Sequence, residues 1–102
     1  MHEPSDKVVT RNRSVLDAAL AMAVRVGYRT MTRQDVAALA GVAVGSVNNA
    51  YGTMDGLRDA VMQAAVDHGV ASVVAQGLAD KHPIACGAPQ PLKDAALASL
   101  AA

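Results

Sequence analysis

Apolar residues recur every three or four positions along most of this chain, which is the spacing of helices with one buried face. The first such stripe consists of Leu16, Ala19, Leu20, Ala23 and Val26. Gly27 follows it, at a place where glycine commonly ends a helix. The pattern therefore predicts a helix over residues 11–26. Residues 1–10 have no such period, and we expect them to form a flexible N-terminal arm.

Two short helices are predicted next, separated by a glycine. Thr32 and Asp35 form a variant capping box at the start of the first. Its inward side is predicted to consist of Val36, Leu39 and Ala40. Gly41 ends this helix, and the second one is predicted over residues 44–50 with Val47 facing inward. On a helical wheel this leaves an outward face made of Val44, Gly45, Asn48 and Asn49.

A long fourth helix is predicted from Thr53, which offers an N-cap, to Pro83. Its apolar residues form two stripes at different angles, and the second consists of Val66, Val70, Val73, Val74 and Leu78. Because the preceding helices can cover only one stripe, we expect the second to form a homodimer interface. A short last helix over residues 92–101 is expected to contribute Leu92, Leu97 and Leu100.

Composition supports an all-α fold. The 102 residues include 22 alanines and 14 valines, with two tyrosines and no Phe or Trp. Alanine is the best helix former, and the alternating β-branched and aromatic runs of strands are missing. A core built from such small side chains is thin, and a short chain often completes a thin core by dimerising.

The charge distribution and the targeting signals indicate where a polyanion-binding surface would lie and which compartment the protein occupies. The net charge is zero, but residues 1–50 hold six basic against four acidic residues, and residues 51–102 hold three against five. Any surface that faces a polyanion is therefore expected in the first half. No secretory leader and no apolar stretch of ~18 residues is found, and the single Cys86 fits a reducing compartment. We expect a cytoplasmic protein without membrane contact.

A short helix, a glycine turn and a second short helix with an open polar face are typical of the helix-turn-helix, whose second helix enters the major groove of DNA. The carboxamides of Asn48 and Asn49 suit this role, since a carboxamide can pair with N6 and N7 of adenine. The helix start at Thr32 presents backbone amides to phosphate. No nucleophile, base and orienting group converge, so we expect neither an enzyme nor a cofactor.

Several local motifs occur together in residues 14–66: the LDAAL helix, Gly27-Tyr28, Met31-Thr32, Asp35-Val36-Ala37, Ala40-Gly41-Val42, Gly45-Ser46-Val47, Tyr51, and Asp55 with Leu57. In these motifs the segment resembles the N-terminal domain of tetracycline-repressor-like (TetR) regulators. The resemblance implies a dimeric DNA-binding transcription regulator. It also implies that Thr32 contacts phosphate, that Arg33 and Gln34 reach the groove, and that a recognition face is formed by Val44, Gly45, Ser46, Asn48 and Asn49. We expect Arg29 to contact phosphate as well.

Some positions depart from the family pattern: Ala43, Asn48, Ala50 and Met54. Position 54 commonly holds a lysine that meets phosphate, so we expect weaker backbone affinity here. Family members usually continue into a sizeable effector domain, whereas this sequence ends soon after its fourth helix, and we expect no small-molecule effector. The predicted organisation is an arm (residues 1–10), a DNA-binding head (residues 11–52) and a dimerisation segment (residues 53–102).

Three functions remain open. The first is a sequence-specific regulator, a repressor acting as a homodimer on an inverted-repeat operator in double-stranded DNA. The second is a DNA-binding accessory or architectural protein. The third is a protein-interaction module that uses the helix-turn-helix surface, which the zero net charge and Met54 would favour.

A metal site is not expected. His68, His82 and Cys86 are too few and too irregularly spaced for a closed zinc site. We predict instead a surface histidine at position 82 and a free thiol at position 86.

Overall fold

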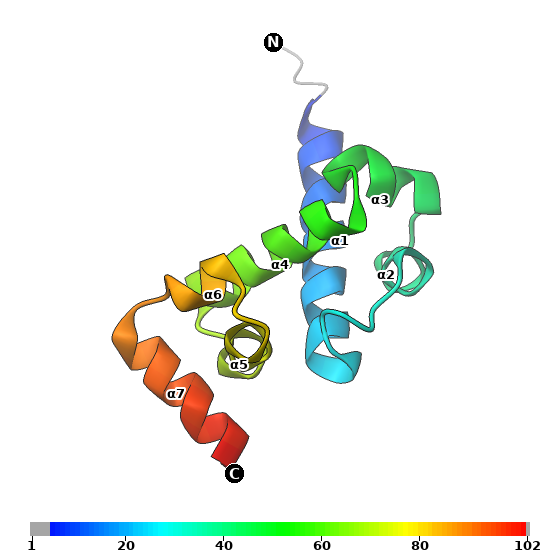
Figure 1. The fold of residues 1–102 in the computed structure, drawn as a ribbon. Helices are drawn as coiled ribbons and strands as arrows, with labels where there is room; N and C mark the ends of the chain where they lie inside the picture. The colour runs from blue at the N-terminus through cyan, green and yellow to red at the C-terminus, as the bar shows by residue number, and fades with distance from the viewer. Residues whose placement is uncertain (1–4, 102) are drawn as a thin grey trace.

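The computed structural model describes residues 5–101, with side chains for residues 13–100, and the described chain is all-helical as predicted (Figure 1). Its helices are α1 (Ser5–Val26), α2 (Arg33–Ala40), α3 (Val44–Tyr51), α4 (Met54–His68), α5 (Ala71–Ala79), α6 (Pro83–Cys86) and α7 (Gln90–Ala101). Within the described chain, no helix has both the length and the apolar character needed to cross a bilayer.

Helix α1 starts earlier than the apolar pattern indicates. It begins at Ser5, so residues 5–10 of the expected arm are helical, whereas residues 1–4 lie outside the described residues. Extending an existing helix costs far less than starting one. A segment next to a packed helix therefore needs no apolar stripe of its own, which is why periodicity gave the wrong start.

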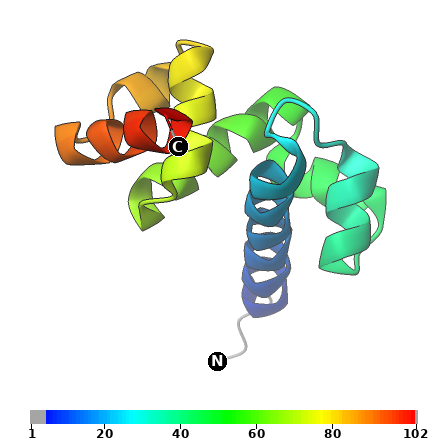
Figure 2. The same ribbon diagram turned by 90° about the horizontal axis from the view of Figure 1, so that it is seen from below.

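Helix α4 is shared by two groups of helices (Figures 1 and 2). We call α1 to α3 the head and α5 to α7 the tail: α1 and α3 of the head and α5 and α6 of the tail pack on α4, whereas α2 packs on α1 and α3, and α7 packs on α5. The largest fully buried side chains come from the head, from α4 and from the tail: Val15, Tyr28, Met31, Val36, Leu57, Val61, Met62, Val73 and Val74. One core thus runs from head to tail through α4.

The predicted long fourth helix is wrong, because the chain breaks at Gly69. This residue adopts a left-handed conformation with φ of +68°, which glycine reaches without steric cost. Its amide reaches back to the carbonyls of Ala65 and Val66, and the Val70 amide donates to the Ala65 carbonyl at 2.8 Å. These bonds close the end of α4 in a Schellman-type cap, and the chain then turns into α5.

This break also corrects the predicted dimer stripe. Val73 and Val74 have no exposed surface within a single chain, since α5 turns them toward the core that α7 covers. Four other members of the predicted interface are half-buried against the same core: Val66, Val70, Leu78 and Leu92. Only Leu97 and Leu100 of the predicted set are largely exposed, at 53% and 61%.

Gly77 allows the tail to pack this closely. A Cβ atom at this position would lie 2.6 Å from the Ala85 Cβ and 2.6 Å from the Met62 Cε. The methionine could move aside, but the alanine Cβ is fixed to the backbone of α6. A glycine is therefore needed where α5 meets α4 and α6.

Candidate nucleic-acid interface

The corner formed by α2, Gly41 and α3 has the predicted helix-turn-helix shape. The Thr32 hydroxyl accepts from the Asp35 amide at 3.1 Å, and the Asp35 carboxylate accepts from the Thr32 amide at 3.3 Å. This confirms the capping box. Gly41 is left-handed, with φ of +72°, and the Val42 amide closes the turn on the Ala37 carbonyl at 3.0 Å.

Leu39 was expected to lock the two short helices together, but it is 47% exposed. The side of α2 that packs inward is made instead by Val36, Ala37 and Ala40. On a helix with 3.6 residues per turn, the centre of this buried side is about 100° away from Leu39. Val36 and Val47 make the predicted core contacts, whereas Leu39 lies on the outer surface.

The two asparagines of α3 differ in exposure. Asn49 and Gly45 are exposed, which agrees with their predicted outward position. Asn48 is half-buried, and its carboxamide oxygen is shielded from solvent without a hydrogen-bond partner among the described residues. A buried acceptor without a partner costs about 1–3 kcal/mol. The structure therefore corrects the outward position expected for Asn48.

A hollow of about 280 Å³, here the α2 hollow, opens where the first turn of α2 meets α3 and α4. It is lined by Met31, Thr32, Arg33, Gln34, Val44, Met54 and Arg58. Four predicted interface residues thus come together: Thr32, Arg33, Gln34 and Val44. The amino end of α2 adds a partial positive charge. The combined groups suit a phosphate.

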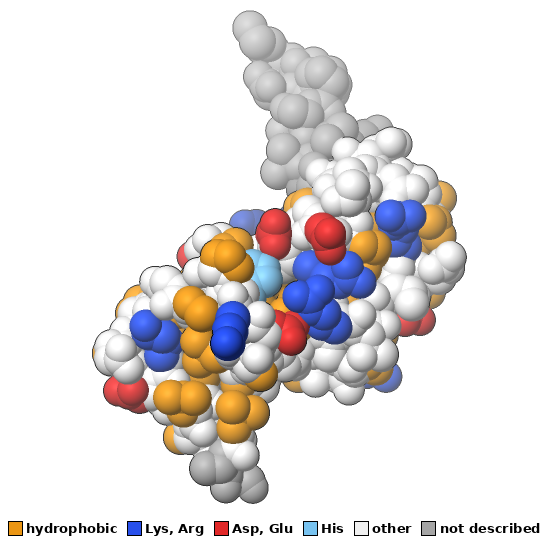
Figure 3. All heavy atoms as spheres, viewed as in Figure 1, with side chains coloured by type: hydrophobic (Ala, Val, Ile, Leu, Met, Phe, Trp, Pro, Cys, Tyr) orange, Lys and Arg blue, Asp and Glu red, His pale blue; other side chains and the backbone are white. Residues whose placement is uncertain are grey.

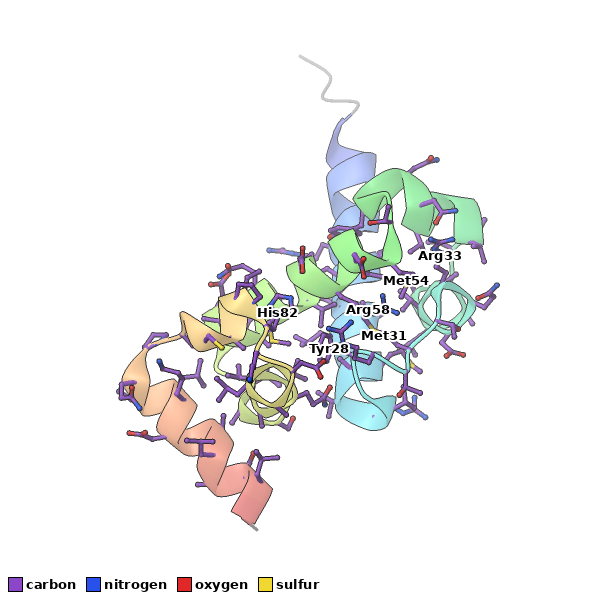
Figure 4. All side chains as sticks on the ribbon, in the orientation of Figure 1. Tyr28, Met31, Arg33, Met54, Arg58 and His82 are labelled. Carbon is purple, nitrogen blue, oxygen red and sulfur yellow. The ribbon has the colours of Figure 1, made fainter. Side chains whose placement is uncertain are left out.

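Arg58 also lines the α2 hollow, and the sequence analysis did not single it out. It lies one helical turn after Met54, so it shares the side of α4 on which the family commonly has a lysine. That i, i+4 relation was the available signal. Figure 4 shows Arg58 and Met54 along α4, with Arg33 beyond them at α2. The Arg58 Nε also donates to the Tyr28 carbonyl at 3.2 Å, and one terminal nitrogen contacts Asp55 at 3.1 Å.

Arg29 does not join the α2 hollow. Its Nε donates to an Asp80 carboxylate oxygen at 2.6 Å, and its guanidinium lies 5.3 Å from the centre of the Tyr28 ring. Hydrogen bonding to Arg29 lowers the pKa of Asp80 below its ordinary value, and the same bond raises the pKa of Arg29. The structure thus places Arg29 at the contact between head and tail, away from the other predicted phosphate ligands.

A second hollow of about 330 Å³, here the junction hollow, opens at that contact. It is lined by Tyr28, Arg29, Asp55, Arg58, Asp59, His82 and Pro83. Its two arginines are each paired with a carboxylate, Arg29 with Asp80 and Arg58 with Asp55, and its His82 imidazole bonds to Asp59. In Figure 3 these charges gather near the middle of the face, and hydrophobic side chains lie beside them over the tail.

His82 is not the surface residue predicted. It is buried, its Nε2 lies 2.9 Å from an Asp59 carboxylate oxygen, and its Nδ1 accepts from the Ile84 amide at 3.2 Å. Since Nδ1 accepts a backbone proton, Nε2 carries the ring proton and donates to Asp59. His82 therefore caps α6 and ties it to α4. Cys86 is exposed and free, as predicted.

Comparison with known proteins gives one positive result. Residues 15–61 match the family model described as bacterial regulatory proteins, tetR family. The match covers the helix-turn-helix corner and ends within α4. No significant match is found among curated proteins or among solved structures.

Proposed function

Residues 15–61 form the helix-turn-helix domain of a tetR-type DNA-binding transcription regulator, and from this premise we propose a repressor that binds an inverted-repeat operator as a homodimer. The observation that carries the proposal is the α2 hollow, which joins the amino end of α2 to Arg33 and Arg58 beside the open face of α3. A dimer bound across a promoter represses by occupancy alone, without any further activity.

Contacts to DNA divide between two parts of the corner. The exposed Asn49 on α3 and Gln34 on the first turn of α2 read base edges in the major groove. Thr32, Arg33 and the free amides of α2 hold a phosphate in the α2 hollow. Asn48 has a lesser part in base reading, because its carboxamide oxygen faces inward.

The homodimer interface lies on the exposed side of α7, around Leu97 and Leu100. These two leucines are three positions apart, so they share a side of the helix, and they are among the few large apolar side chains that the described fold leaves open. A symmetric contact between two such sides would bury them and place the two heads apart. Replacing both leucines by aspartate should yield monomers in sedimentation.

The proposal is tested by binding to DNA that flanks the protein's own coding region, with random DNA of equal length as the competitor. A repressor protects a defined inverted repeat whose half-sites lie about one helical turn, or a multiple of it, apart. Length-dependent binding without a preferred sequence would indicate an architectural protein. Absence of binding would indicate a protein-interaction module.

Base reading is tested with Asn49→Ala. We expect a loss of ~1–3 kcal/mol at the protected site and nearly unchanged affinity for random DNA. Ser72→Ala is a matched control, since Ser72 is an exposed polar residue on α5, outside the head. Equal losses on both DNAs would contradict the assignment of Asn49 to bases.

A further inference from the structure

The turn between α1 and α2 is held by a side chain from the tail. The Tyr28 amide donates to the Gln76 Oε1 at 2.8 Å, and the Gln76 Nε2 donates to the Ala23 carbonyl at 3.0 Å. A single carboxamide on α5 thus ties the last turn of α1 to Tyr28, two residues after the end of that helix. Both functional groups of Gln76 are used, so the side chain has one defined position.

Asp80 lies one helical turn further along, just past the end of α5. Its carboxylate accepts from the Tyr28 hydroxyl and from the Arg29 Nε. Arg58 of α4 donates to the Tyr28 carbonyl at 3.2 Å. The amide, carbonyl and hydroxyl of Tyr28 are therefore all held from outside the head, by α4 and by the last turn of α5.

This cluster lies where its geometry affects the head. Tyr28 is almost fully buried, and only three residues separate it from Thr32, which caps α2. Elsewhere α1 and α5 touch over a small area. The hydrophobic effect has no preferred direction, whereas hydrogen bonds require defined donor and acceptor directions. The cluster is thus the part of the head-to-tail contact that specifies an angle.

We infer that Gln76 and Asp80 are positioning residues that hold the head at a fixed angle to the tail. The inference rests on the proposed function for its consequence: in a dimer joined through the tails, this angle sets the distance between the two recognition helices. The spacing of operator half-sites is then read by residues that lie far from the DNA.

The first test measures how affinity depends on half-site spacing. Operators are prepared with the natural spacing and with one or two base pairs inserted or removed. We expect the wild type to lose roughly tenfold or more on each change, about the cost of a mismatched base pair. We expect Gln76→Ala and Asp80→Ala to lose about threefold or less relative to their own best operator, within the few tenths to 1 kcal/mol of an ordinary surface contact.

A merely structural role would not give this result. General destabilisation lowers affinity for every operator alike, whereas a loosened angle flattens the spacing profile and leaves binding to a single half-site unchanged. Gln63→Ala is the matched control, because Gln63 makes a 2.8 Å bond to Asp67 within α4 and should keep the wild-type profile. Asp80→Asn keeps an acceptor for Tyr28 and should fall between wild type and Asp80→Ala.

The second test needs no DNA. Spin labels are placed at the exposed positions of Leu39→Cys on α2 and Ala95→Cys on α7, in a Cys86→Ser background with an excess of unlabelled subunits. We expect a narrow distance distribution in the wild type and in Gln63→Ala, and a broad one in Gln76→Ala and Asp80→Ala. Circular dichroism identifies any variant that fails to fold, and Asp80→Asn then takes its place.

The outcomes separate the two proposals. Narrow distributions in the folded variants would overturn the inference whether or not the protein binds DNA. Broad distributions with a wild-type spacing profile would overturn the link to operator spacing. Broad spin-label distance distributions in the variants, together with a wild type that binds inverted repeats no better than random DNA, would support the positioning role and contradict the proposed operator.

Discussion

The α2 hollow and the junction hollow have similar volumes, and Arg58 lines both, yet they differ in the state of their charges. Each arginine of the junction hollow faces a carboxylate, since Arg29 meets Asp80 and Arg58 meets Asp55, and the His82 imidazole bonds to Asp59. In the α2 hollow, Arg33 makes no ion pair with any described residue, and the amino end of α2 adds partial positive charge. The comparison teaches that the number of cations around a hollow does not determine whether the hollow can bind an anion. What matters is whether those cations already have carboxylate partners within the protein.

Arg58→Ala should have the largest effect, because this residue serves both hollows. The change leaves the partly buried Tyr28 carbonyl without its donor, which costs about 1–3 kcal/mol of unfolding free energy. It also removes a cation from the α2 hollow, but because that guanidinium already pairs with Asp55, affinity for all DNA sequences should fall less than in Arg33→Ala. Thermal unfolding and binding titrations check the two effects. A change in binding alone would show that Arg58 belongs to the α2 hollow only.

Arg33→Ala should affect DNA binding without affecting the fold. Losing one phosphate contact weakens binding to all sequences and flattens the salt dependence by about one unit of slope. Stability should stay within about 0.5 kcal/mol, as for other surface changes. Arg29→Ala is the matched control and should leave the salt slope unchanged, since Asp80 already pairs with this guanidinium. Similar slopes for the two variants would contradict the contrast between the hollows.

Met54→Lys should add an unpaired positive charge to the α2 hollow and so increase its difference in charge from the junction hollow. A lysine at the rim of the α2 hollow adds one cation where none of the described lining residues carries a carboxylate. We expect tighter binding to every DNA sequence and a salt slope about one unit steeper. Filter-binding titrations at two salt concentrations check this. An unchanged slope would place the phosphate elsewhere.

Lowering the pH should weaken the contact at Asp80. Hydrogen bonds from Arg29 and then from Tyr28 lower the pKa of this carboxyl in the folded state. Such a group contributes stability above its unfolded pKa of about 3.9, and this contribution is lost as pH falls through the lower folded value. The stability gap between wild type and Asp80→Asn should be constant from about pH 5 to 7 and close in more acidic solution. A gap that persists in acid would assign the effect to packing.

Features that depend on neighbouring residues could be predicted from the sequence. The capping box of Thr32 and Asp35, the turn at Gly41 and the buried Val47 all follow from rules that act within a few positions. The family resemblance pointed to the same segment, and the match of residues 15–61 supports it.

Features that depend on distant contacts could not be predicted. The predicted long fourth helix contains two glycines, Gly69 and Gly77, and local rules do not say which of them ends a helix. Gly69 turns the chain, whereas Gly77 remains helical and lets α5 approach α6. The Arg29 partner lies 51 positions away in the sequence. Buried Val73 and Val74 looked like an interface because the fold that covers them depends on that break.

Helix α3 has little to stabilise it on its own. It is eight residues long, Ala43 gives it no side-chain cap, and the carboxamide oxygen of Asn48 has no hydrogen-bond partner among the residues whose side chains are described. Helices this short are not stable alone in water. The recognition helix should therefore open more readily than its neighbours, and its amides should exchange with solvent sooner. Under the proposed function, a correct operator has to supply the free energy of ordering α3. A mismatched site then loses affinity in two ways, through lost contacts and through a helix that stays partly open.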